Sequence, residues 1–589
     1  MASPLLLTEV VVLRALACDY DGTIASQDRI GPAALDALIR AREAGLRLIL
    51  VTGRTFFELT RVCERLDLFD AVVAENGAVI YRPGVGTIGD QAPPPPPRLL
   101  VELDRRGIPY QLGRVVIGTA RAYEADVRAA LDTVGVSFEL IPNRAALMLL
   151  PTGVSKGSGV RAVIRELGFS FHDVLGLGDA ENDLDLFDAC GFSGCPASAE
   201  PAVRERADWV FPGESGDAIA RAIAGPILSG RLPLDDRRRH RLVLGWAVDT
   251  AEPVTIPARE VIVLVHGDPL SGKSWLAGAL VERLKRGAYA TCVIDPEGDY
   301  DVLARVPGVT CATIDGESAM VEALGLFERN PTACLVANLA DLPHARKIKV
   351  IERGLAVIAE LRARVGLPHW VVLDEAHYSL HQGGVAEAAL ALEHKGFCLA
   401  TYRSSWLRPS VIRAVDVLIL ARTGRPDERT FLDTLLSEPA WRNQRVVPAL
   451  RDLPHGQFIA IQPDRTGART AVSFAATPRE TPHVRHLRKY ADSTLLPDQR
   501  FLFRWPDGRL AATAESFASF RQAVASIDDL VLADHARRRD LSRWVLDVFA
   551  DKTLGVQLRK LEARWERGEV PDLRRELERL IAFRYDMEP

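Results

Sequence analysis

Residues 15–23, Ala-Leu-Ala-Cys-Asp-Tyr-Asp-Gly-Thr, decide the fold of the first part of this chain. The apolar run that ends at Cys18 predicts a buried strand, and Asp19 and Asp21 follow at its end. Side chains two residues apart on an extended chain point the same way, so both carboxylates lie on one side of the strand end. Two carboxylates held that close repel each other unless a divalent cation or a shared proton offsets their charge. The stretch therefore predicts phosphate chemistry at the end of a strand.

The same pattern repeats from residue 1 to about 228: a short apolar run, a polar cluster at its end, then an amphipathic helical stretch. This alternation predicts a doubly wound α/β fold with a parallel sheet. Ligands of such sheets bind beyond the carboxyl ends of the strands. The polar residues near these ends are the candidate site residues: Thr52, Gly53, Arg54, Lys156, Asp179, Asn182 and Asp183. A hydroxyl, a bare backbone and a guanidinium at 52–54 suit an oxyanion.

These motifs, in this order, resemble those of the haloacid dehalogenase superfamily in its Cof-like branch of small-molecule phosphatases, type IIB. The branch also carries a motif matching Glu75-Asn76-Gly77-Ala78. The resemblance implies that Asp19 is the nucleophile, forming an aspartyl-phosphate, and that Asp21 is the general acid and base. It also implies that Thr52 and Lys156 bind the phosphoryl group.

The resemblance further implies one Mg²⁺ ion in this unit. Asp19, the carbonyl of Asp21 and Asp179 would hold it, with Asp183 and Asn182 completing or orienting that shell. Substrate choice in this branch belongs to a cap inserted in the core, here expected at about 82–150 as a small α+β unit. Its opening Pro93–Pro97 predicts a stiff linker rather than an SH3-type ligand. A small cap resembles those of phosphoglycolate and sugar-phosphate phosphatases, so a compact phosphomonoester is the expected substrate.

A second catalytic unit is expected over 259–480. The apolar run 261–265 is followed by Gly267-Asp268-Pro269-Leu270-Ser271-Gly272-Lys273-Ser274 and then by a helical stretch. This is the P-loop pattern in its strand–loop–helix setting, and it predicts a P-loop NTPase α/β domain that binds ATP and a second Mg²⁺. Backbone N–H groups would wrap the phosphates, Lys273 would neutralise their charge, and the Ser274 hydroxyl would reach the metal.

The partner acids of the P-loop are expected at the end of a later strand. The run 370–373 is followed by Asp374 for the magnesium shell and by Glu375, which is placed to activate water. The alternative is a buried strand with a helix-capping Asp-Glu. Residues 292–300 resemble the second-strand signature of the HerA and FtsK-type ATPases, although Tyr402 stands near the position of that group's sensor glutamine. Such ATPases form rings completed by a neighbour's arginine, for which Arg403, Arg422 and Arg425 are equal candidates.

The segments around these units carry weaker signals. Residues 229–258, with basic residues at 237–241, predict a solvated linker leading into a β-hairpin. Residues 485–589 predict a small, mainly helical C-terminal domain of unknown function. Within it, 501–505 with Pro506-Asp507-Gly508 predicts a strand and a tight turn. A helical cluster holds His535, Arg539, Asp540 and Trp544, and Pro571 predicts a break between the last helices.

Composition narrows the function classes. The chain has 589 residues, a net charge of −5 and eight cysteines without C-x-x-C pairs, so we expect several domains in a reducing cytoplasm and no structural zinc. Its apolar N-terminal stretch 4–17 predicts a first strand rather than a signal peptide. No apolar run approaches the roughly 20 residues that cross a bilayer.

The preferred hypothesis is a magnesium-dependent phosphomonoester hydrolase coupled to an ATP-hydrolysing domain, forming a homo-oligomeric ring. The alternatives are a DNA-associated motor whose N-terminal unit trims phosphates, an end-healing kinase-phosphatase, and a chain in which one unit is a silent binding platform. The net charge and the lack of a long basic stripe do not favour nucleic acid.

Overall fold

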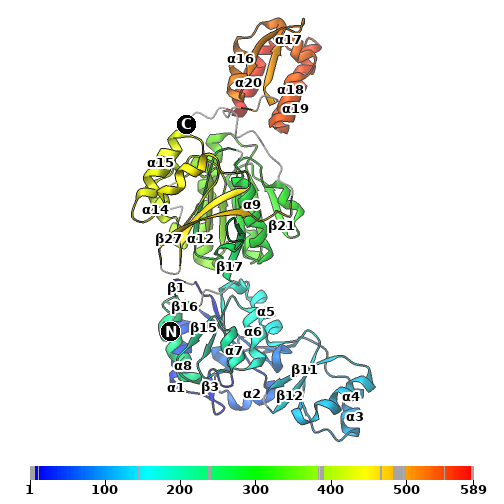
Figure 1. The fold of residues 1–589 in the computed structure, drawn as a ribbon. Coiled ribbons are helices and arrows are strands. Elements are labelled where there is room, and N and C mark those ends of the chain that lie inside the picture. Colours follow the sequence, from blue (N-terminus) through cyan, green and yellow to red (C-terminus); the bar gives the residue numbers. More distant parts are fainter. Residues whose placement is uncertain are drawn as a thin grey trace. The chain divides into compact units, whose positions relative to one another are not determined.

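The computed structural model describes residues 7–10, 12–143, 145–234, 240–269, 271–381, 384, 391–464, 467–481, 495, 499–549 and 551–585. The chain divides into two compact units, residues 1–240 and 241–589. Both units are built on a large sheet, shown in blue to cyan for the first and in green to yellow for the second (Figure 1).

An eight-stranded sheet forms the centre of the first unit, in the order β15-β14-β13-β2-β5-β6-β7-β8. The strands from β15 to β6 are parallel, and β7 and β8 continue the sheet antiparallel. This is the parallel α/β sheet that the sequence predicts. The bounds are β2 Ala15–Asp19, β5 Arg47–Val51, β6 Ala71–Ala74, β7 Val79–Arg82, β8 Thr87–Asp90, β13 Val174–Leu177, β14 Phe192–Pro196 and β15 Trp209–Phe211.

Helices cover both faces of this sheet because its strands are apolar on both sides. In β5, Leu48 and Leu50 belong to one hydrophobic cluster, whereas Ile49 and Val51 belong to another. Alternate side chains of a strand point to opposite faces, so each cluster needs its own helices. One face packs against α1 (Pro32–Glu43), α2 (Phe56–Val62) and α8 (Ser215–Ala222), and the other against α5 (Lys156–Leu167), α6 (Leu184–Ala189) and α7 (Pro201–Arg206).

The cap is a separate α+β layer with its own core, and it is shorter than expected. Its antiparallel sheet has the order β11-β12-β10-β9, and its helices α3 and α4 pack through residues such as Leu103 and Val127 (Figure 1). The bounds are α3 Pro97–Arg105, β9 Gln111–Leu112, β10 Ile117–Ala120, α4 Glu124–Val134, β11 Phe138–Asn143 and β12 Ala146–Pro151. The predicted start at residue 82 is wrong, because β8 pairs with β7 and belongs to the core sheet.

The first unit extends beyond the predicted limit at residue 228. The stretch predicted as one first strand forms two, and the first of them, β1 (Leu7–Val10), pairs antiparallel with β16 (Arg231–Leu234). A two-stranded hairpin, β3 (Ala25–Ser26) and β4 (Arg29–Ile30), follows β2. Of the basic cluster, Arg237, Arg238 and Arg239 lie outside the described residues, whereas His240 Nε2 lies 3.0 Å from Asp208 Oδ1 of this unit.

The second unit contains an eleven-stranded sheet in the order β18-β17-β27-β26-β25-β19-β24-β23-β20-β22-β21. The seven strands from β25 to β21 are parallel, and the other four extend the sheet antiparallel. The bounds are β17 Arg241–Ala247, β18 Pro253–Pro257, β19 Ile262–His266, β20 Thr291–Asp295, β21 Val309–Thr313, β22 Cys334–Asn338, β23 Trp370–Leu373, β24 Phe397–Thr401, β25 Val417–Leu420, β26 Gln457–Pro463 and β27 Arg469–Ala476.

The hairpin predicted after the linker is confirmed as β17 and β18, and it belongs to this sheet. β17 pairs with β27, where Gly245 lies opposite Ala476. A Cβ atom at Gly245 would come within 2.0 Å of the carbonyl oxygen of Ala475, so the close approach of the two strands requires glycine there. A pairing partner more than 200 residues away along the chain was not visible in the local pattern.

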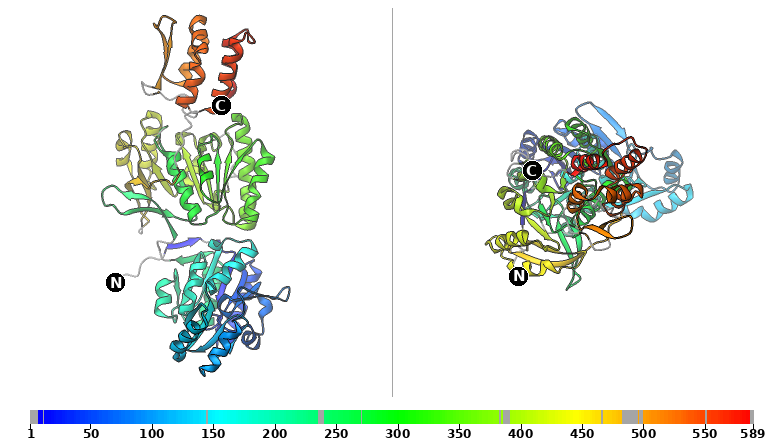
Figure 2. Two further views of the ribbon diagram at one scale, coloured as in Figure 1. Left: turned by 90° about the vertical axis from the view of Figure 1, so that its right-hand side faces the viewer. Right: turned by 90° about the horizontal axis from the view of Figure 1, so that it is seen from above.

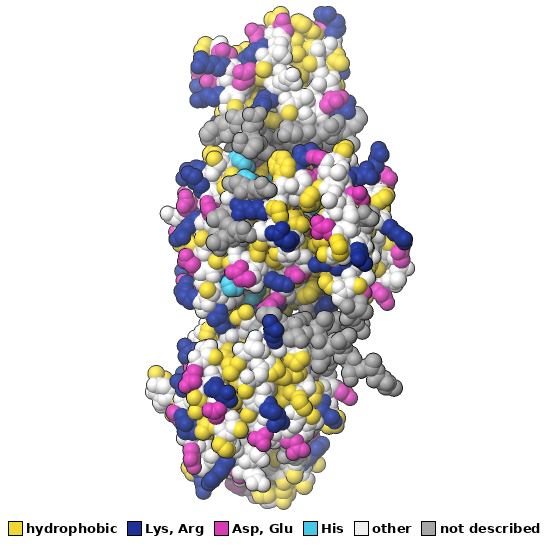
Figure 3. Space-filling view, turned by 90° about the vertical axis from the view of Figure 1, so that its left-hand side faces the viewer, with side chains coloured by type: hydrophobic (Ala, Val, Ile, Leu, Met, Phe, Trp, Pro, Cys, Tyr) yellow, Lys and Arg dark blue, Asp and Glu magenta, His cyan; other side chains and the backbone are white. Residues whose placement is uncertain are grey.

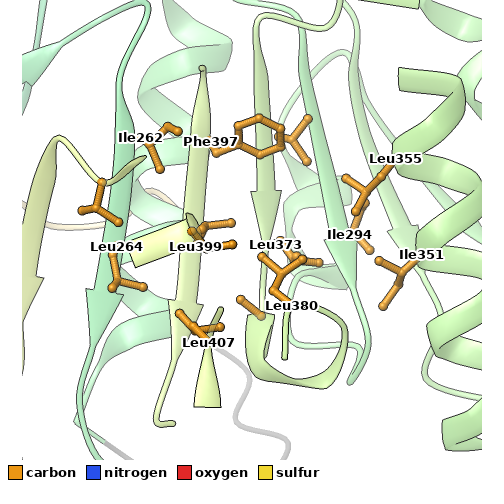
Figure 4. Packing of buried hydrophobic residues seen from close by; sticks show 14 of the residues in the cluster. Ile262, Leu264, Ile294, Ile351, Leu355, Leu373, Leu380, Phe397, Leu399 and Leu407 are labelled. Carbon is orange, nitrogen blue, oxygen red and sulfur yellow. The ribbon is translucent and has the colours of Figure 1, made fainter. Parts of the chain in front are cut away.

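Helices flank both faces of the second sheet as well, as Figures 1 and 2 show. α9 (Lys273–Arg286) packs on the face that carries Val263 and Val265. The opposite face carries Ile262, Leu264 and Leu399, which belong to one hydrophobic cluster with Ile351 and Leu355 of α12 (Figure 4). Its helices are α10 Glu317–Leu324, α11 Leu326–Arg329, α12 His344–Val365, α14 Pro409–Ala414 and α15 Pro426–Ser437.

The C-terminal part forms a hairpin and five helices around its own hydrophobic core. The predicted strand and tight turn form the hairpin of β28 and β29, and Pro571 lies between α19 and α20 as expected. The bounds are β28 Phe501–Arg504, β29 Leu510–Ala514, α16 Phe517–Ser526, α17 Asp529–Arg537, α18 Asp540–Phe549, α19 Lys552–Glu566 and α20 Leu573–Tyr585. His535 bonds Asp540 through Nδ1 at 2.8 Å and accepts the Arg504 N–H at 2.9 Å, a structural use of this cluster.

Two chemical features of the described residues bear on the sequence expectations. All eight cysteines are free thiols, and seven of them are buried. None of the helices in the described ranges combines the length and the apolar character that a bilayer-spanning segment needs.

Candidate functional site

Neighbouring strands of the first sheet bring the predicted acidic residues together. β2 lies between β13 and β5. Asp19 is the last residue of β2, and Asp179 follows β13 after Gly178. Parallel strands end at the same edge of a sheet, so residues from distant motifs meet there. Asp183 joins them from the 3-10 turn Glu181–Asp183, which begins directly after that loop.

The carboxylates of Asp19, Asp179 and Asp183 form a buried cluster. One oxygen of each lies within 4.8 Å of the others, and all three residues are buried. Burial, followed by the charge of Asp183, raises the pKa of Asp19 well above its ordinary value, because both disfavour the ionised form of the Asp19 carboxyl group. Carboxylate oxygens are the ligands that Mg²⁺ prefers, so this donor set fits a magnesium ion.

Lys156 and Thr23 complete the polar lining of the cluster. The Lys156 Nζ lies 2.7 Å from Asp19 Oδ1 and 2.7 Å from Asp183 Oδ1. Although burial lowers the pKa of this ammonium, the two carboxylates raise it above its ordinary value. Thr23 Oγ1 donates to Asp179 Oδ1 at 3.1 Å. Thr23 was not among the predicted site residues, and its place at the end of Asp-Tyr-Asp-Gly-Thr was the available signal.

Two glycines allow the loops to approach the cluster. Gly22 has φ +79°, and a Cβ atom there would come within 2.4 Å of Asp179 Oδ2. A Cβ atom on Gly178 would come within 2.5 Å of the Asp183 side chain. Asp183 Oδ2 in turn accepts the N–H groups of Asp179 and Ala180 at 3.0 and 3.1 Å. Asp183 therefore orients the loop that carries Asp179 and also pairs with the lysine.

Asp21 and Arg54 pair with each other outside the buried carboxylate cluster. The Asp21 carboxylate is not part of the buried cluster, which leaves its backbone carbonyl as the metal ligand that the resemblance implies. Arg54 Nε donates to Asp21 Oδ2 at 2.8 Å, and its terminal nitrogen pairs with both Asp21 and Asp28. The hydrogen bond to Asp21 raises the pKa of the Arg54 guanidinium. Arg54 was predicted to grip phosphate, and here it holds two carboxylates.

The loop at residues 52–54 and Asn182 meet at Asn76. Thr52 is buried, and its Oγ1 accepts the N–H of Arg54 at 3.1 Å. A Cβ atom on Gly53 would lie 3.1 Å from Asn76 Oδ1. Asn182 Nδ2 donates to the same Asn76 oxygen at 3.4 Å. Asn182 therefore contacts Asn76, where the resemblance implied a role in the shell of the metal.

Glu75 connects the core to the cap, a role that sequence reasoning missed. Its buried carboxylate accepts the backbone N–H groups of Arg114, Val115 and Val116 at 2.9, 3.0 and 3.2 Å. These residues lie in the cap loop between β9 and β10. A Cβ atom on Gly113 would come within 2.6 Å of this carboxylate. The backbone bonds fix the cap loop against the end of the core sheet. The motif at residues 75–78 was the only sequence signal.

A cavity of about 450 Å³ lies where the cap meets the core. The cap contributes Arg121 and Pro142, and the core contributes Glu181, Asn182 and the segment 200–202. Arg121 carries the only guanidinium in this lining, and within the described ranges no carboxylate lies at ion-pair distance from it. The cavity can therefore hold a small polar molecule next to the loop that carries Asp179 and Asp183, and the Arg121 guanidinium of the cap supplies a positive charge there.

The P-loop sequence of the second unit lies between β19 and α9. Lys273 is buried and donates from Nζ to the carbonyl oxygen of Asp268 at 2.9 Å. Gly272 has φ +100°, in the region that favours glycine. The Ser271 Oγ is buried without a hydrogen-bond partner among the described residues. Of the predicted loop, Gly267 and Pro269 lie in the described part, and Leu270 lies outside the described residues.

Asp374 and Glu375 follow β23 and are both buried. Ser274 Oγ donates to Asp374 Oδ2 at 3.0 Å, so the two predicted metal-binding residues are in direct contact. Glu375 has φ +47°, and its Oε2 lies 3.5 Å from His377 Nδ1. Asp295, at the end of β20, has a pKa raised to about 8 by burial, then by Asp299, and also by Asp374. This edge of the sheet therefore carries a concentration of buried carboxylates close to the P-loop.

The arginines considered as inter-subunit fingers differ in their surroundings. Arg403 pairs with Asp427 and lies over the Trp406 ring at 4.9 Å. Arg425 Nε lies 3.5 Å from Asp427 Oδ1. Arg422 contributes a backbone carbonyl, which accepts the Asp268 N–H at 2.8 Å. Among the described residues, Arg422 is the one of the three without a carboxylate at ion-pair distance.

Comparison with known proteins finds relatives for the first unit. A family model described as haloacid dehalogenase-like hydrolase matches residues 16–91 and 140–223. The residues between these two segments include most of the cap. A phosphoglycolate phosphatase of Methanothermobacter thermautotrophicus is 34% identical over 226 residues, which are 36% of this chain and 97% of that protein. One of Haloarcula marismortui is 30% identical over 223 residues, 36% of this chain and 95% of that protein.

Solved structures of similar sequence length to the first unit also match. The crystal structure of Thermoplasma acidophilum 0175 is 21% identical, covers 37% of this chain and 99% of its own, and has a TM-score of 0.33.

Proposed function

Since the N-terminal unit makes this chain a member of the haloacid dehalogenase-like hydrolases, in their Cof-like branch, we propose that this unit is a magnesium-dependent phosphatase. Its proposed substrates are small phosphomonoesters. The observation that carries the proposal is the buried cluster of Asp19, Asp179 and Asp183 with Lys156 in contact. A carboxylate nucleophile among other carboxylates suits a site that a phosphoryl group and a cation share.

The first half of the reaction transfers the phosphoryl group to the enzyme. An Asp19 oxygen attacks phosphorus, the new Asp19 O–P bond forms, and the bond from phosphorus to the ester oxygen breaks. Asp21 donates a proton to the leaving oxygen, which departs as an alcohol. Lys156 and Thr52 hold the other phosphoryl oxygens. Bound magnesium would neutralise charge on the phosphoryl oxygens in this site.

The second half releases phosphate. The Asp21 carboxylate takes a proton from a water molecule while the oxygen of that water attacks phosphorus. The Asp19 O–P bond then breaks, which gives inorganic phosphate and the free Asp19 carboxylate. Arg54 holds Asp21 in the structure. Asp21 can act only when this pair loosens, and Arg54 then becomes available for the substrate anion.

The substrate is a compact phosphomonoester with a second anionic group. The curated relatives named above are phosphoglycolate phosphatases. The cavity between cap and core has a small volume, about 450 Å³, and Arg121 is the cap residue there that can pair with a carboxylate. These observations support 2-phosphoglycolate or a similar small acid phosphate.

Replacing Arg121 with methionine tests this substrate class. The variant is expected to raise the KM for 2-phosphoglycolate about tenfold, because an exposed charge-assisted hydrogen bond contributes about 1.5 kcal/mol. The KM for p-nitrophenyl phosphate should stay unchanged, since that ester has no second anion. Steady-state kinetics on both substrates provide the measurement.

Arg128→Met is the matched control, because Arg128 lies on the cap helix α4 and pairs with Glu124 at 2.7 Å. It should leave both KM values as they are. An equal rise in KM for the two substrates in Arg121→Met would argue against a carboxylate partner and for a general disturbance of the cap.

For the second unit, we propose ATP binding and hydrolysis. Three observations support a phosphate and Mg²⁺ site at the start of α9: the contact between Ser274 and Asp374, the buried Lys273, and the Ser271 hydroxyl, which has no hydrogen-bond partner in the described part of the chain. Glu375 is the candidate base for the attacking water. A ring assembly, in which a neighbour's arginine completes the site, and a coupling between the ATPase and the phosphatase belong to the same proposal.

The nucleic-acid alternative rests on the HerA and FtsK resemblance alone. Among the described residues drawn in Figure 3, Lys and Arg side chains are interspersed with Asp and Glu side chains, which does not favour a nucleic-acid surface. The net charge of −5 points the same way. We therefore place the small-molecule phosphatase first and the DNA-associated motor second.

A phosphatase screen tests the proposal as a whole. The full chain is expected to hydrolyse one or more small phosphomonoesters from a panel of metabolites and nucleotide ends with Mg²⁺, and to lose this activity in excess EDTA. Running the panel with and without ATP measures the coupling. Turnover of every substrate without metal would overturn the role of the carboxylate cluster, and a hit restricted to nucleic-acid ends would favour the alternative.

A further inference from the structure

The second unit contains a large cavity that the proposed reactions do not use. Its volume is about 780 Å³, within the range of sites for nucleotide-sized ligands. Its wall is formed by segments after β23 and β24 and by the helices α14 and α15, with aromatic side chains such as Tyr378, Trp406 and Phe431. It therefore opens at the carboxyl ends of the parallel strands, the edge where such sheets bind ligands.

Aromatic rings from three segments of the chain meet in this wall. The ring of His377 lies 4.7 Å from those of Tyr378 and Tyr402 and 5.9 Å from that of Trp406, all at steep angles. His344 packs against Tyr378 in the same manner. Edge-to-face packing leaves ring faces available to a further planar group. Trp406 is 49% exposed, so one large face of this cluster is not covered by the described residues.

The lining also contains cations that suit an anionic or electron-rich ligand. The Arg403 guanidinium lies over the Tyr402 and Trp406 rings at 5.6 and 4.9 Å and orders this wall. Arg413 is exposed on α14, and among the described residues no carboxylate pairs with it. Glu438 is the only carboxylate of the lining. The cavity thus combines stacking surfaces with a guanidinium at its rim.

This cavity borders the P-loop site without being part of it. The Lys273 Nζ lies 5.9 Å from the centre of the Tyr402 ring. His377 bonds Thr401 Oγ1 through Nδ1 at 2.9 Å, and the same nitrogen lies 3.5 Å from Glu375 Oε2. Two wall residues of the cavity are therefore in contact with the groups proposed to bind phosphate and to activate water.

We propose that this cavity is a second binding site that takes a nucleobase, stacked on Trp406, next to the P-loop. A base offers a flat π-system that can stack on the rings of this wall and hydrogen-bonding edges that can meet polar lining residues such as Arg413 and Glu438. The sugar-phosphate of the ligand lies toward Arg413. The base can come from a free nucleoside or nucleotide, or from a single-stranded nucleic acid. Both sources present the same nucleobase to the cavity.

Binding to the full chain tests the site without any ATPase assay. Adenosine, guanosine, cytidine, thymidine and a short oligothymidylate are titrated into the Lys273→Ala variant by isothermal calorimetry, so that a P-loop interaction with phosphate does not contribute. At least one probe is expected to bind. Trp406→Ala in this background should weaken it about tenfold or more, the contribution of one stacked base. Trp406→Leu should weaken it similarly, and Trp406→Phe should restore most of the affinity.

Trp246→Ala is the matched control, since Trp246 is 47% exposed on β17 and does not line the cavity. It should leave the affinity unchanged. Binding of nucleosides identifies a free ligand, and binding of the oligomer alone identifies a single strand; both support the site. Three outcomes would overturn the proposed nucleobase site. These are no binding of any probe, equal losses of affinity in Trp246→Ala and Trp406→Leu, and displacement of the probe from the wild type by a non-hydrolysable ATP analogue. The proposed ATPase can fail its own test without affecting these outcomes.

Discussion

Asp19→Asn is expected to reduce magnesium-dependent hydrolysis of p-nitrophenyl phosphate by at least about a thousandfold, because the amide cannot form the aspartyl-phosphate. It also removes one carboxylate from the cluster that fits magnesium. The fold should persist, since Lys156 keeps its 2.7 Å contact with Asp183 and the amide has nearly the size of the carboxylate. Phosphate release under saturating substrate measures the effect.

Two controls make this result interpretable. Asp36→Asn changes an exposed carboxylate of α1 that pairs with Arg40, and it should leave turnover unchanged. ATP hydrolysis by the Asp19→Asn protein should equal that of the wild type, and circular dichroism should show the same thermal unfolding. Undiminished phosphatase turnover in Asp19→Asn would refute the assignment of the nucleophile and with it the function proposed for the first unit.

Lys273→Ala is expected to reduce ATP hydrolysis by about a hundredfold to a thousandfold, the usual cost of removing one group that stabilises transition-state charge. In the structure the ammonium donates to the Asp268 carbonyl at 2.9 Å, so it already lies across the loop that would wrap the phosphates. Phosphate release from ATP, with phosphatase activity recorded on the same sample, provides the measurement.

Lys285→Ala serves as its control, because Lys285 belongs to the same helix and donates to the carbonyl of Thr332, away from the loop. It should keep full ATP hydrolysis. The phosphatase activity should survive in both variants if the two sites are independent, and a parallel loss in Lys273→Ala would indicate coupling. ATP hydrolysis that persists in a pure Lys273→Ala preparation would exclude the P-loop as its site.

Much of the first site was predictable because its chemistry lies at strand ends. An apolar run followed by Asp19, and another followed by Gly178 and Asp179, are local patterns. The rule that parallel strands end at one edge converts them into a spatial prediction. The structure brings Asp19, Asp179, Asp183 and Lys156 together accordingly.

The partners of the exposed and bridging residues were not predictable in this way. Arg54 could serve phosphate or carboxylate equally well by its chemistry, and the presence of Asp28 beside it depends on the hairpin after β2. Asn182 contacts Asn76, and Glu75 binds three N–H groups of the cap. Each of these choices depends on which segments fold against each other, and a linear motif does not contain that information.

The boundaries failed for the same reason. β8 fell within the predicted cap, and the predicted hairpin of β17 and β18 was not assigned to any sheet, because a strand pattern does not identify its pairing partner. β8 pairs with β7 in the core, whereas β17 pairs with β27 near the far end of the second sheet. Pairing is decided by the surfaces that remain uncovered once the central strands have formed, and these surfaces exist only in the folded unit.

By itself, the sequence determined the parallel α/β sheet of the first unit, the residues at its strand ends and the strand–loop–helix setting of the P-loop pattern. These follow from local periodicity and from side-chain chemistry, which act over a few residues. The tertiary structure alone decided that Arg54 holds Asp21 and Asp28, that Glu75 fixes the cap, and that rings from three distant segments surround one cavity beside Lys273. Those contacts join residues far apart in the chain, and their free energy is gained only when the complete sheet has brought the segments together.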